Sequence, residues 1–284
     1  MVDILRAETA GFCMGVDLAL RKLDRSVESN EGGTSIYTLG PIIHNPQVLS
    51  HYAHKGVVQA REVEAIPDAS LVLIRAHGVP LELQQRLEAK RAKVVDATCP
   101  KVKKAQTLIA EQSAKGKRLL LFGDKVHPEV KGLLSYAGED AVVFESLEEL
   151  MQIALDPCLE YFAAAQTTQH RSEFNLIVQE LRRRLGQDMP AFDTICDTTR
   201  KRQEEALGIA AEVELMVVVG GYNSGNTKRL ARVVADQGVE SVHVESEDDL
   251  PLERIRGKRR VGLTAGASTP SGIIDAVESR LRSL

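Results

Sequence analysis

Residues 94–110 read VVDATCPKVKKAQTLIA, and this stretch decides the fold. Val94-Val95-Asp96 is a short apolar run typical of a strand, and Cys99 follows it closely. After the cysteine, apolar residues recur at spacings of three and four, which places them on one face of a helix: Val102, Ala105 and Ile109. The stretch therefore predicts a strand, a cysteine at the end of that strand, and a helix.

The same order of features occurs twice more in the chain. Asp3-Ile4-Leu5-Arg6 precedes Cys13, and Phe192-Asp193-Thr194-Ile195 precedes Cys196. A stretch with helical spacing follows each of these cysteines as well. Length alone suggests two domains of roughly 150 residues each. The repeat instead favours three units of about 95 residues, with boundaries 1–97, 98–194 and 195–284.

Continuous apolar runs lie between the cysteines. They contain β-branched residues and leucine without alternation, which is typical of strands buried on both faces of a parallel sheet. The clearest runs are Ile36–Leu39, Leu71–Ile74, Leu119–Phe122, Leu215–Val219 and Val261–Thr264. The expected fold class is therefore α/β, with three pseudo-threefold-related α/β units forming a trefoil around a central cavity.

Composition excludes several classes of protein. The 284 residues are 43% hydrophobic and 27% charged, with a net charge of −4, so there is no basic field for nucleic acid. The four cysteines form no C-x-x-C motif, and no apolar run reaches the ~20 residues of a membrane span. Without a signal peptide at its start, the sequence predicts a cytoplasmic protein with neither nucleic acid nor membrane as partner.

Each unit also carries two polar loops that follow strands. The first loops are His44-Asn45-Pro46, His127-Pro128-Glu129 and Asn223-Ser224-Gly225-Asn226. The second loops are Ala76-His77-Gly78, Gln166-Thr167-Thr168 and Ala267-Ser268-Thr269. Because ligands of α/β sheets bind at the carboxyl ends of the strands, we expect these six loops to line one cavity.

The cysteines are candidate metal ligands. A lone cysteine is more often a core residue, but Cys13, Cys99 and Cys196 each stand between a strand and a helix, where a helix N-terminus stabilises a thiolate. Three thiolates suit zinc or an iron–sulfur cluster, and a cluster with three protein ligands leaves one iron open. Cys158 lies outside the repeat, and we assign it a structural role.

The loop histidines His44, His77 and His127 are candidate ligands of a polyanion, because a protonated imidazole donates from both nitrogens. They are also possible metal ligands. Residues 220–227 are a near miss to a P-loop, with Asn226 where the motif has lysine. This substitution argues against a nucleotide triphosphatase, and the segment is either an ordinary turn or a phosphate cradle.

Ser224, Asn226 and Ser268 add neutral hydrogen-bond donors to the predicted cavity. Glu129 is the one carboxylate in the six loops. Beside a cluster and a diphosphate, like charge and desolvation would favour its protonated form, which suits a proton donor. A solvated surface glutamate and a charge at the N-terminus of a helix are the alternative interpretations.

Taken together in their order along the chain, these residues resemble the IspH/LytB family of 4-hydroxy-3-methylbut-2-enyl diphosphate reductases. The motifs that carry the resemblance are Gly11-Phe12-Cys13-Met14-Gly15-Val16, His44-Asn45, Ala76-His77-Gly78-Val79, Asp96-Ala97-Thr98-Cys99-Pro100, His127-Pro128-Glu129-Val130, Gln166-Thr167-Thr168, Cys196 with Thr198-Thr199 and Arg202-Gln203, Asn223-Ser224-Gly225-Asn226, and Thr264-Ala265-Gly266-Ala267-Ser268. The family's frequent Ser-Ser-Asn is Ser224-Gly225-Asn226 here, so Gly225 offers only a backbone N–H.

The resemblance implies the last step of the non-mevalonate isoprenoid pathway, the two-electron, two-proton removal of the substrate hydroxyl. It implies one [4Fe-4S] cluster on Cys13, Cys99 and Cys196, with an open iron for the substrate oxygen, and reduced ferredoxin or flavodoxin as electron donor. Glu129 is implied as proton donor, with Thr167 as its neighbour and relay. The implied diphosphate contacts are His44, His77, His127, Ser224, Gly225, Asn226 and Ser268.

Two other functions compete with this one. A dehydratase similar to quinolinate synthase also has three α/β units and an open cluster, but its carboxylate substrate would favour Arg and Lys in the loops, and the six loops contain neither. A non-catalytic protein that binds a phosphate ligand, with ordinary cysteines, is the second alternative.

Overall fold

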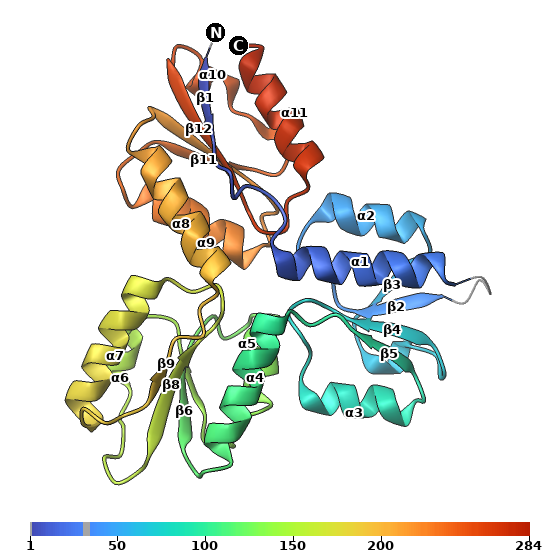
Figure 1. Cartoon of the computed structure of the whole chain (residues 1–284), viewed down its shortest axis with the longest axis vertical. Coiled ribbons are helices and arrows are strands. Elements are labelled where there is room, and N and C mark those ends of the chain that lie inside the picture. Colours follow the sequence, from blue (N-terminus) through green and yellow to red (C-terminus); the bar gives the residue numbers. More distant parts are fainter. Residues whose placement is uncertain (1, 31–34) are drawn as a thin grey trace. The chain divides into compact units, whose positions relative to one another are not determined.

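Three parallel sheets organise the chain. The computed structural model describes residues 2–30 and 35–284, and within these it has twelve strands in three four-stranded sheets (Figure 1). Every strand pair is parallel. The expected α/β class with three repeated sheets is confirmed.

The three sheets share one strand order. One is β3-β2-β4-β5, built from β2 (Ile36–Leu39), β3 (Val57–Ala60), β4 (Leu71–Ile74) and β5 (Lys93–Asp96). A second is β7-β6-β8-β9, built from β6 (Arg118–Phe122), β7 (Val142–Phe144), β8 (Tyr161–Ala165) and β9 (Ala191–Phe192). In both, the first strand along the chain lies between the second and the third, and the fourth is at the edge.

The third sheet has the same order but takes its last strand from the other end of the chain. It reads β11-β10-β12-β1, from β10 (Leu215–Val219), β11 (Ser241–Val244), β12 (Arg260–Ala265) and β1 (Asp3–Arg6). Asp3 pairs with Arg260 and Arg6 with Leu263. The strand before Cys13 therefore completes a sheet with the C-terminal part of the chain.

Helices connect these strands. The α-helices are α1 (Met14–Glu28), α2 (Pro46–His54), α3 (Leu81–Ala89), α4 (Pro100–Ser113), α5 (Pro128–Leu134), α6 (Leu147–Gln152), α7 (Arg171–Leu185), α8 (Asp197–Ala210), α9 (Gly225–Ala235), α10 (Leu252–Ile255) and α11 (Ser271–Arg282). Two short 3₁₀ helices are η1 (Val63–Ala65) and η2 (Glu247–Asp249). No helix in the described residues is long and apolar enough to cross a membrane.

The apolar runs are explained by burial on both faces of a sheet. In β6, Leu120 and Phe122 belong to one core cluster, with α7, while Leu119 and Leu121 belong to another, with α4 and α5. Successive strand residues point to opposite faces, so both sets must be apolar when both faces carry helices. β10 is divided in the same way, with Val217 facing the cluster that contains α11.

The strand predictions succeed for the central strands and fail at one edge. The predicted runs at Ile36–Leu39, Leu71–Ile74 and Leu215–Val219 coincide with β2, β4 and β10. The prediction of a strand over Phe192–Ile195 is wrong beyond Phe192, where β9 ends. The side chain of Asp193 accepts a hydrogen bond of 3.1 Å from the N–H of Ile195, and this local turn takes the backbone out of the sheet.

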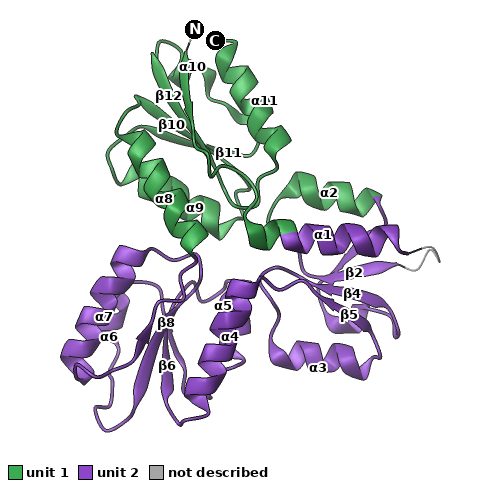
Figure 2. Cartoon of the chain, viewed as in Figure 1, with its two compact units in different colours: residues 1–17, 43–54, 197–284 green, residues 18–42, 55–196 purple. Residues whose placement is uncertain are grey.

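The chain divides into two compact units (Figure 2). Unit 1 comprises Met1–Asp17, Ile43–His54 and Asp197–Leu284, and it contains the sheet that β1 completes. Unit 2 comprises Leu18–Ile42 and Lys55–Cys196, and it contains the other two sheets. The boundaries 1–97, 98–194 and 195–284 stay a prediction.

Candidate functional site

One backbone hydrogen bond recurs at the three repeat cysteines. Each cysteine N–H donates to a carbonyl oxygen in the second loop of its own sheet. The pairs are Cys13 to Ala267 at 3.1 Å, Cys99 to Ala76 at 2.9 Å and Cys196 to Thr167 at 2.8 Å. In each sheet, this bond fastens the segment after the edge strand to the loop after the neighbouring strand.

The surroundings of these cysteines suit thiolate ligands. Cys13, Cys99 and Cys196 form no disulfide and are half-buried, and each directly precedes a helix of 14 or 15 residues. The positive end of a helix favours the deprotonated, metal-binding form of a thiol. Cys158 is also free but exposed, and its N–H donates to Asp156 Oδ1 at 2.9 Å. The donor set of three placed thiols therefore fits a soft metal centre.

The recurring bond also sets the register between the second loops. It makes Ala76, Thr167 and Ala267 equivalent, so the residues that follow them are equivalent too. Those residues are His77, Thr168 and Ser268. The sequence alone gives the three second loops but no register between them, and Thr168 was not among the predicted site residues. The turns within these loops give the same register, because the N–H groups of Gly78, Gln169 and Thr269 donate to the carbonyl oxygens three residues earlier.

Glu129 and Thr167 form a buried pair in unit 2. Glu129 is 1% exposed and Thr167 is 5% exposed. The Thr167 N–H donates to Glu129 Oε1 at 2.7 Å, and the Thr167 hydroxyl donates to Oε2 at 2.9 Å. Because the Thr167 carbonyl accepts the Cys196 N–H, the carboxyl group is fixed next to a cysteine loop. The alternative of a solvated glutamate is therefore wrong.

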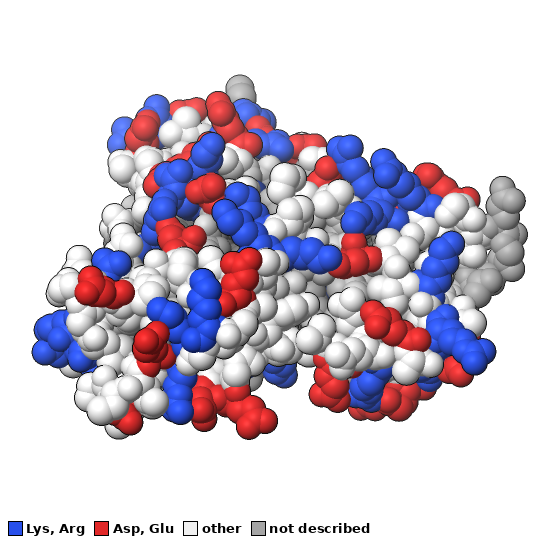
Figure 3. Space-filling model, turned by 60° about the horizontal axis from the view of Figure 1, so that its bottom comes forward, with Lys and Arg blue, Asp and Glu red and all other residues white. Residues whose placement is uncertain are grey.

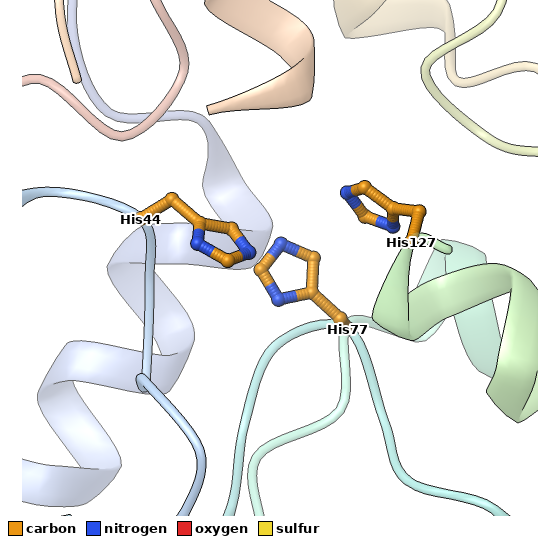
Figure 4. Close-up of side chains that lie close together, drawn as sticks. All are labelled: His44, His77 and His127. Carbon is orange, nitrogen blue, oxygen red and sulfur yellow. The ribbon is translucent and has the colours of Figure 1, made fainter. Parts of the chain in front are cut away.

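Two of the loop histidines contact each other in unit 2. His77 follows β4 and His127 caps α5, and their ring centroids are 5.3 Å apart with the rings at 83° (Figure 4). His127 Nδ1 accepts the Glu129 N–H at 3.1 Å. This bond fixes the ring of His127 at the start of α5.

His44 lies in unit 1 with the other first- and second-loop residues of that unit. The hydroxyl of Ser268 donates to the His44 carbonyl at 3.3 Å. Gly221 lies against the same carbonyl, and a Cβ at this position would be 2.7 Å from the oxygen. A glycine is required here because any side chain would push the two loops apart.

The loop before α9 provides donors at a helix start. Ser224 is 4% exposed and caps α9, accepting the Thr227 N–H at 3.3 Å and its hydroxyl at 2.9 Å. Gly225 is the first residue of α9, so its N–H has no acceptor within the helix. Within the described residues, Asn226 Nδ2 is buried without a hydrogen-bond partner. These donors fit phosphate oxygens, as the near miss to a P-loop suggested.

The guanidinium group of Arg75 is hydrogen-bonded to the backbone of the His77 loop. Arg75 directly precedes that loop, and its Nε donates to the Gly78 carbonyl at 3.3 Å. Burial lowers the pKa of Arg75 to about 10, so it is still charged at neutral pH. Elsewhere, acidic and basic side chains are interspersed on the face shown in Figure 3. Sequence reasoning missed Arg75 because it lies one position outside the motif.

Two of the cysteine loops are braced by an aspartate three residues earlier. Asp96 Oδ1 accepts the Thr98 N–H at 2.9 Å, and Asp193 stands in the same relation to Cys196. Asp96 also pairs with Lys103, and Lys22 Nζ donates to its carbonyl at 2.6 Å. Burial by itself would raise the pKa of Asp96, but the bonds from Lys103 and Thr98 outweigh it and lower that pKa below 3.8.

Comparison with known proteins places these features in one family. Residues 4–282 match the family described as LytB protein. A protein of Nitratidesulfovibrio vulgaris strain Miyazaki F is 58% identical over 283 residues, covering 100% of both chains. A protein of Aquifex aeolicus is 38% identical, covering 100% of this chain and 97% of its own. Both carry the name 4-hydroxy-3-methylbut-2-enyl diphosphate reductase.

Two solved structures are similar over nearly the whole chain. The E-1-hydroxy-2-methyl-but-2-enyl-4-diphosphate reductase of Plasmodium falciparum has a TM-score of 0.92 at 25% identity, covering 98% of this chain and 87% of that one. A second structure, an (E)-4-hydroxy-3-methyl-but-2-enyl diphosphate reductase described as the terminal enzyme of the non-mevalonate pathway, has a TM-score of 0.70 at 38% identity, covering 100% of both.

The Asp96 brace predicts a pH-dependent stability. Because the pKa of Asp96 is lower in the folded chain, its charge stabilises the fold above about pH 4, and this contribution is lost as pH falls through the folded-state pKa. Asp96→Asn keeps the acceptor for Thr98 but loses the ion pair. We expect it to cost up to about 1 kcal/mol at pH 7. The difference from the wild type should shrink toward pH 3 in urea unfolding followed by circular dichroism.

The control is Asp68→Asn, because Asp68 is 80% exposed and pairs with Lys90 at 3.5 Å. It should change the unfolding free energy little at any pH. If Asp96→Asn lowers the unfolding free energy by the same amount at pH 7 and near pH 3, the role assigned to the Asp96 charge is contradicted.

Proposed function

Because this chain belongs to the LytB protein family, we propose that it is a 4-hydroxy-3-methylbut-2-enyl diphosphate reductase. The reaction takes two electrons and two protons, breaks the allylic carbon–oxygen bond, releases water, and yields isopentenyl and dimethylallyl diphosphate. It is the terminal step of the non-mevalonate pathway. One observation carries the assignment: the buried Glu129 is held through both oxygens by Thr167, whose carbonyl in turn holds Cys196.

The two competing functions are not favoured. The two relatives named above carry the reductase name, and the chain matches 97% and 100% of their lengths at 38% and 58% identity. A quinolinate-synthase-like dehydratase would need cations in the loops for its carboxylates, and the six loops hold none. A phosphate-binding protein without catalysis would give no reason for a buried acid fixed beside a free, half-buried cysteine.

We propose that Cys13, Cys99 and Cys196 hold one [4Fe-4S] cluster, with one iron left open. The half-buried thiols at three helix starts support this, as does the exposed position of Cys158 outside the repeat. When bound, such a cluster supplies electrons and a Lewis-acidic iron. We propose reduced ferredoxin or flavodoxin as the protein that delivers the electrons.

The diphosphate is bound mainly by neutral donors in this proposal. The contacts are His44, His77, His127, Ser224, Gly225, Asn226 and Ser268, and the register of the cysteine hydrogen bond adds Thr168. The buried Nδ2 of Asn226 and the N–H of Gly225 at the start of α9 support this assignment. Holding the diphosphate fixes the reacting end of the substrate, which converts binding energy into orientation.

Glu129 delivers the proton in this proposal. Its Oε1 accepts a main-chain N–H, which cannot reverse direction, so Oε2 is the oxygen that carries the proton. In this relay, Oε2 gives its proton to the Thr167 hydroxyl oxygen. The hydroxyl then points its own hydrogen at the substrate and passes that proton on. Thr167 is thereby the relay, and burial of the pair keeps bulk water from competing for the proton.

The direct test of function is turnover. Chain purified and reconstituted anaerobically with iron and sulfide should be coloured, and it should convert the allylic diphosphate when reduced viologen dye supplies electrons. Isopentenyl and dimethylallyl diphosphate are the expected products, measured by chromatography. A colourless, iron-free protein after reconstitution would exclude the cluster, and a loaded protein that leaves the substrate intact would exclude the reaction.

Replacement of the acid separates chemistry from binding. Glu129→Gln keeps an oxygen that accepts the Thr167 N–H but holds no transferable proton, so turnover should fall by about 10²- to 10⁴-fold. Iron content and diphosphate affinity should stay at wild-type levels. The control is Glu139→Gln on the exposed surface, which should keep full activity. Turnover near wild type in Glu129→Gln would exclude Glu129 as the proton donor.

Serine replacements identify the cluster ligands. Cys13→Ser, Cys99→Ser and Cys196→Ser should each lose most of the bound iron, because an alcohol is a poor ligand for a soft metal centre. Cys158→Ser is the matched control and should retain the wild-type ratio of iron to protein. Loss of iron in the Cys158 variant, or full retention in any of the other three, would show that the ligand set is wrong.

A further inference from the structure

Helix α8 grips the loop that leads to Cys13. Glu205 accepts three hydrogen bonds from this loop: the Glu8 N–H at 2.6 Å, the Thr9 N–H at 2.9 Å and the Thr9 hydroxyl. Arg202, three residues earlier on the same helix, donates from Nη2 to the Gly11 carbonyl at 2.9 Å. All of these residues belong to unit 1.

Arg202 is a buried cation with neutral partners. It is 2% exposed, and its second hydrogen bond runs from Nη1 to the Ala265 carbonyl at 2.6 Å, at the end of β12. Its Nε is buried without an acceptor among the described residues. Burial lowers the pKa of Arg202, and the charge of Glu205 opposes that effect. The guanidinium is held at the carbonyl of Gly11, two residues before Cys13.

The Cys13 loop needs this support because it lacks the brace of the other two. Asp96 and Asp193 hold the Cys99 and Cys196 loops from three residues upstream, but the equivalent residue before Cys13 is Ala10. Gly11 adopts a φ of 112°, a region that other residues rarely occupy, and so presents its carbonyl to Arg202. Side chains of α8 thus replace a local aspartate.

We propose that Arg202 is the positioning residue for the Cys13 loop, and that its buried charge favours the reduced form of the group that Cys13 binds. This inference rests on the proposed function, because it assumes the cluster. Groups behind the ligands orient them and tune the metal, and nearby charge shifts the reduction potential of an iron–sulfur centre. A reduced cluster carries one more negative charge, so a buried cation favours it.

Substitutions can separate the two contributions of Arg202: its paired hydrogen bonds to two carbonyl groups, and its positive charge. Arg202→Gln removes both, whereas Arg202→Lys keeps the charge but cannot hold two carbonyl groups in the same geometry. Glu205→Gln removes a negative charge close to Arg202 and leaves Arg202 in place. Lys201→Gln is the matched control, because it removes one positive charge from an exposed position on the same helix.

The measurements use the anaerobically reconstituted holoenzyme. Two quantities are followed: the rate at which a chelator removes iron, and the midpoint potential in a dye-mediated redox titration. Arg202→Gln should lose iron about 10- to 100-fold faster than the wild type. Its midpoint potential should be more negative. Arg202→Lys should also lose iron faster but keep a potential near the wild type, and Lys201→Gln should change neither quantity.

Glu205→Gln provides the decisive comparison. It should shift the potential in the positive direction, opposite to Arg202→Gln, whereas loosening of the fold alone would move both variants the same way. If Arg202→Gln does not fold, Glu205→Gln and Arg202→Lys carry the test. Equal potentials in wild type, Arg202→Gln and Glu205→Gln would overturn this inference alone. A wild-type chain that takes up no cluster would overturn the proposed function and this inference with it.

Discussion

The hydrogen bond from each cysteine N–H to the second loop of its own sheet is the constraint on which the rest depends. The Cys196 N–H donates to the carbonyl of Thr167, and Thr167 in turn donates to both carboxyl oxygens of Glu129. The Cys99 N–H donates to the carbonyl of Ala76, directly before His77. One backbone contact thus joins each proposed metal ligand to a loop that carries a residue proposed for substrate binding or proton transfer. Because the contact is between main-chain atoms, it tolerates different side chains in the three sheets.

The placement of charge follows a second rule. The loops themselves offer neutral donors, whereas the half-buried Arg75 and the buried Arg202 hold main-chain carbonyl groups next to the loops. An arginine in that position orients the loop through hydrogen bonds from its guanidinium group, and its charge still contributes a positive field. The proposed diphosphate and thiolate ligands both carry negative charge, so such a field would favour their binding without a mobile cation in the loops.

Prediction from the sequence was strongest where a residue's surroundings depend on its near neighbours. Leu215–Val219 is apolar throughout because helices cover both faces of its sheet, and the run therefore indicated a buried parallel strand. Prediction was weakest at the sheet edges. Strand β9 ends at Phe192, and the Asp193 side chain accepts a hydrogen bond from the Ile195 N–H in the turn that follows. The register between the second loops could not be predicted either, because the position of Thr168 relative to His77 follows from a tertiary contact, the bond from Cys196 to Thr167.

The sequence by itself determined the repeated strand, cysteine and helix, the α/β class and the order of motifs that marks the family, because these depend on residues within one turn or one strand of each other. Only the tertiary structure decided that β1 pairs with β12, that Glu129 is buried against Thr167, and that Arg202 reaches Gly11, 191 positions away along the chain. Such contacts join segments that are distant in sequence, and their hydrogen bonds leave no local pattern from which either partner could be identified.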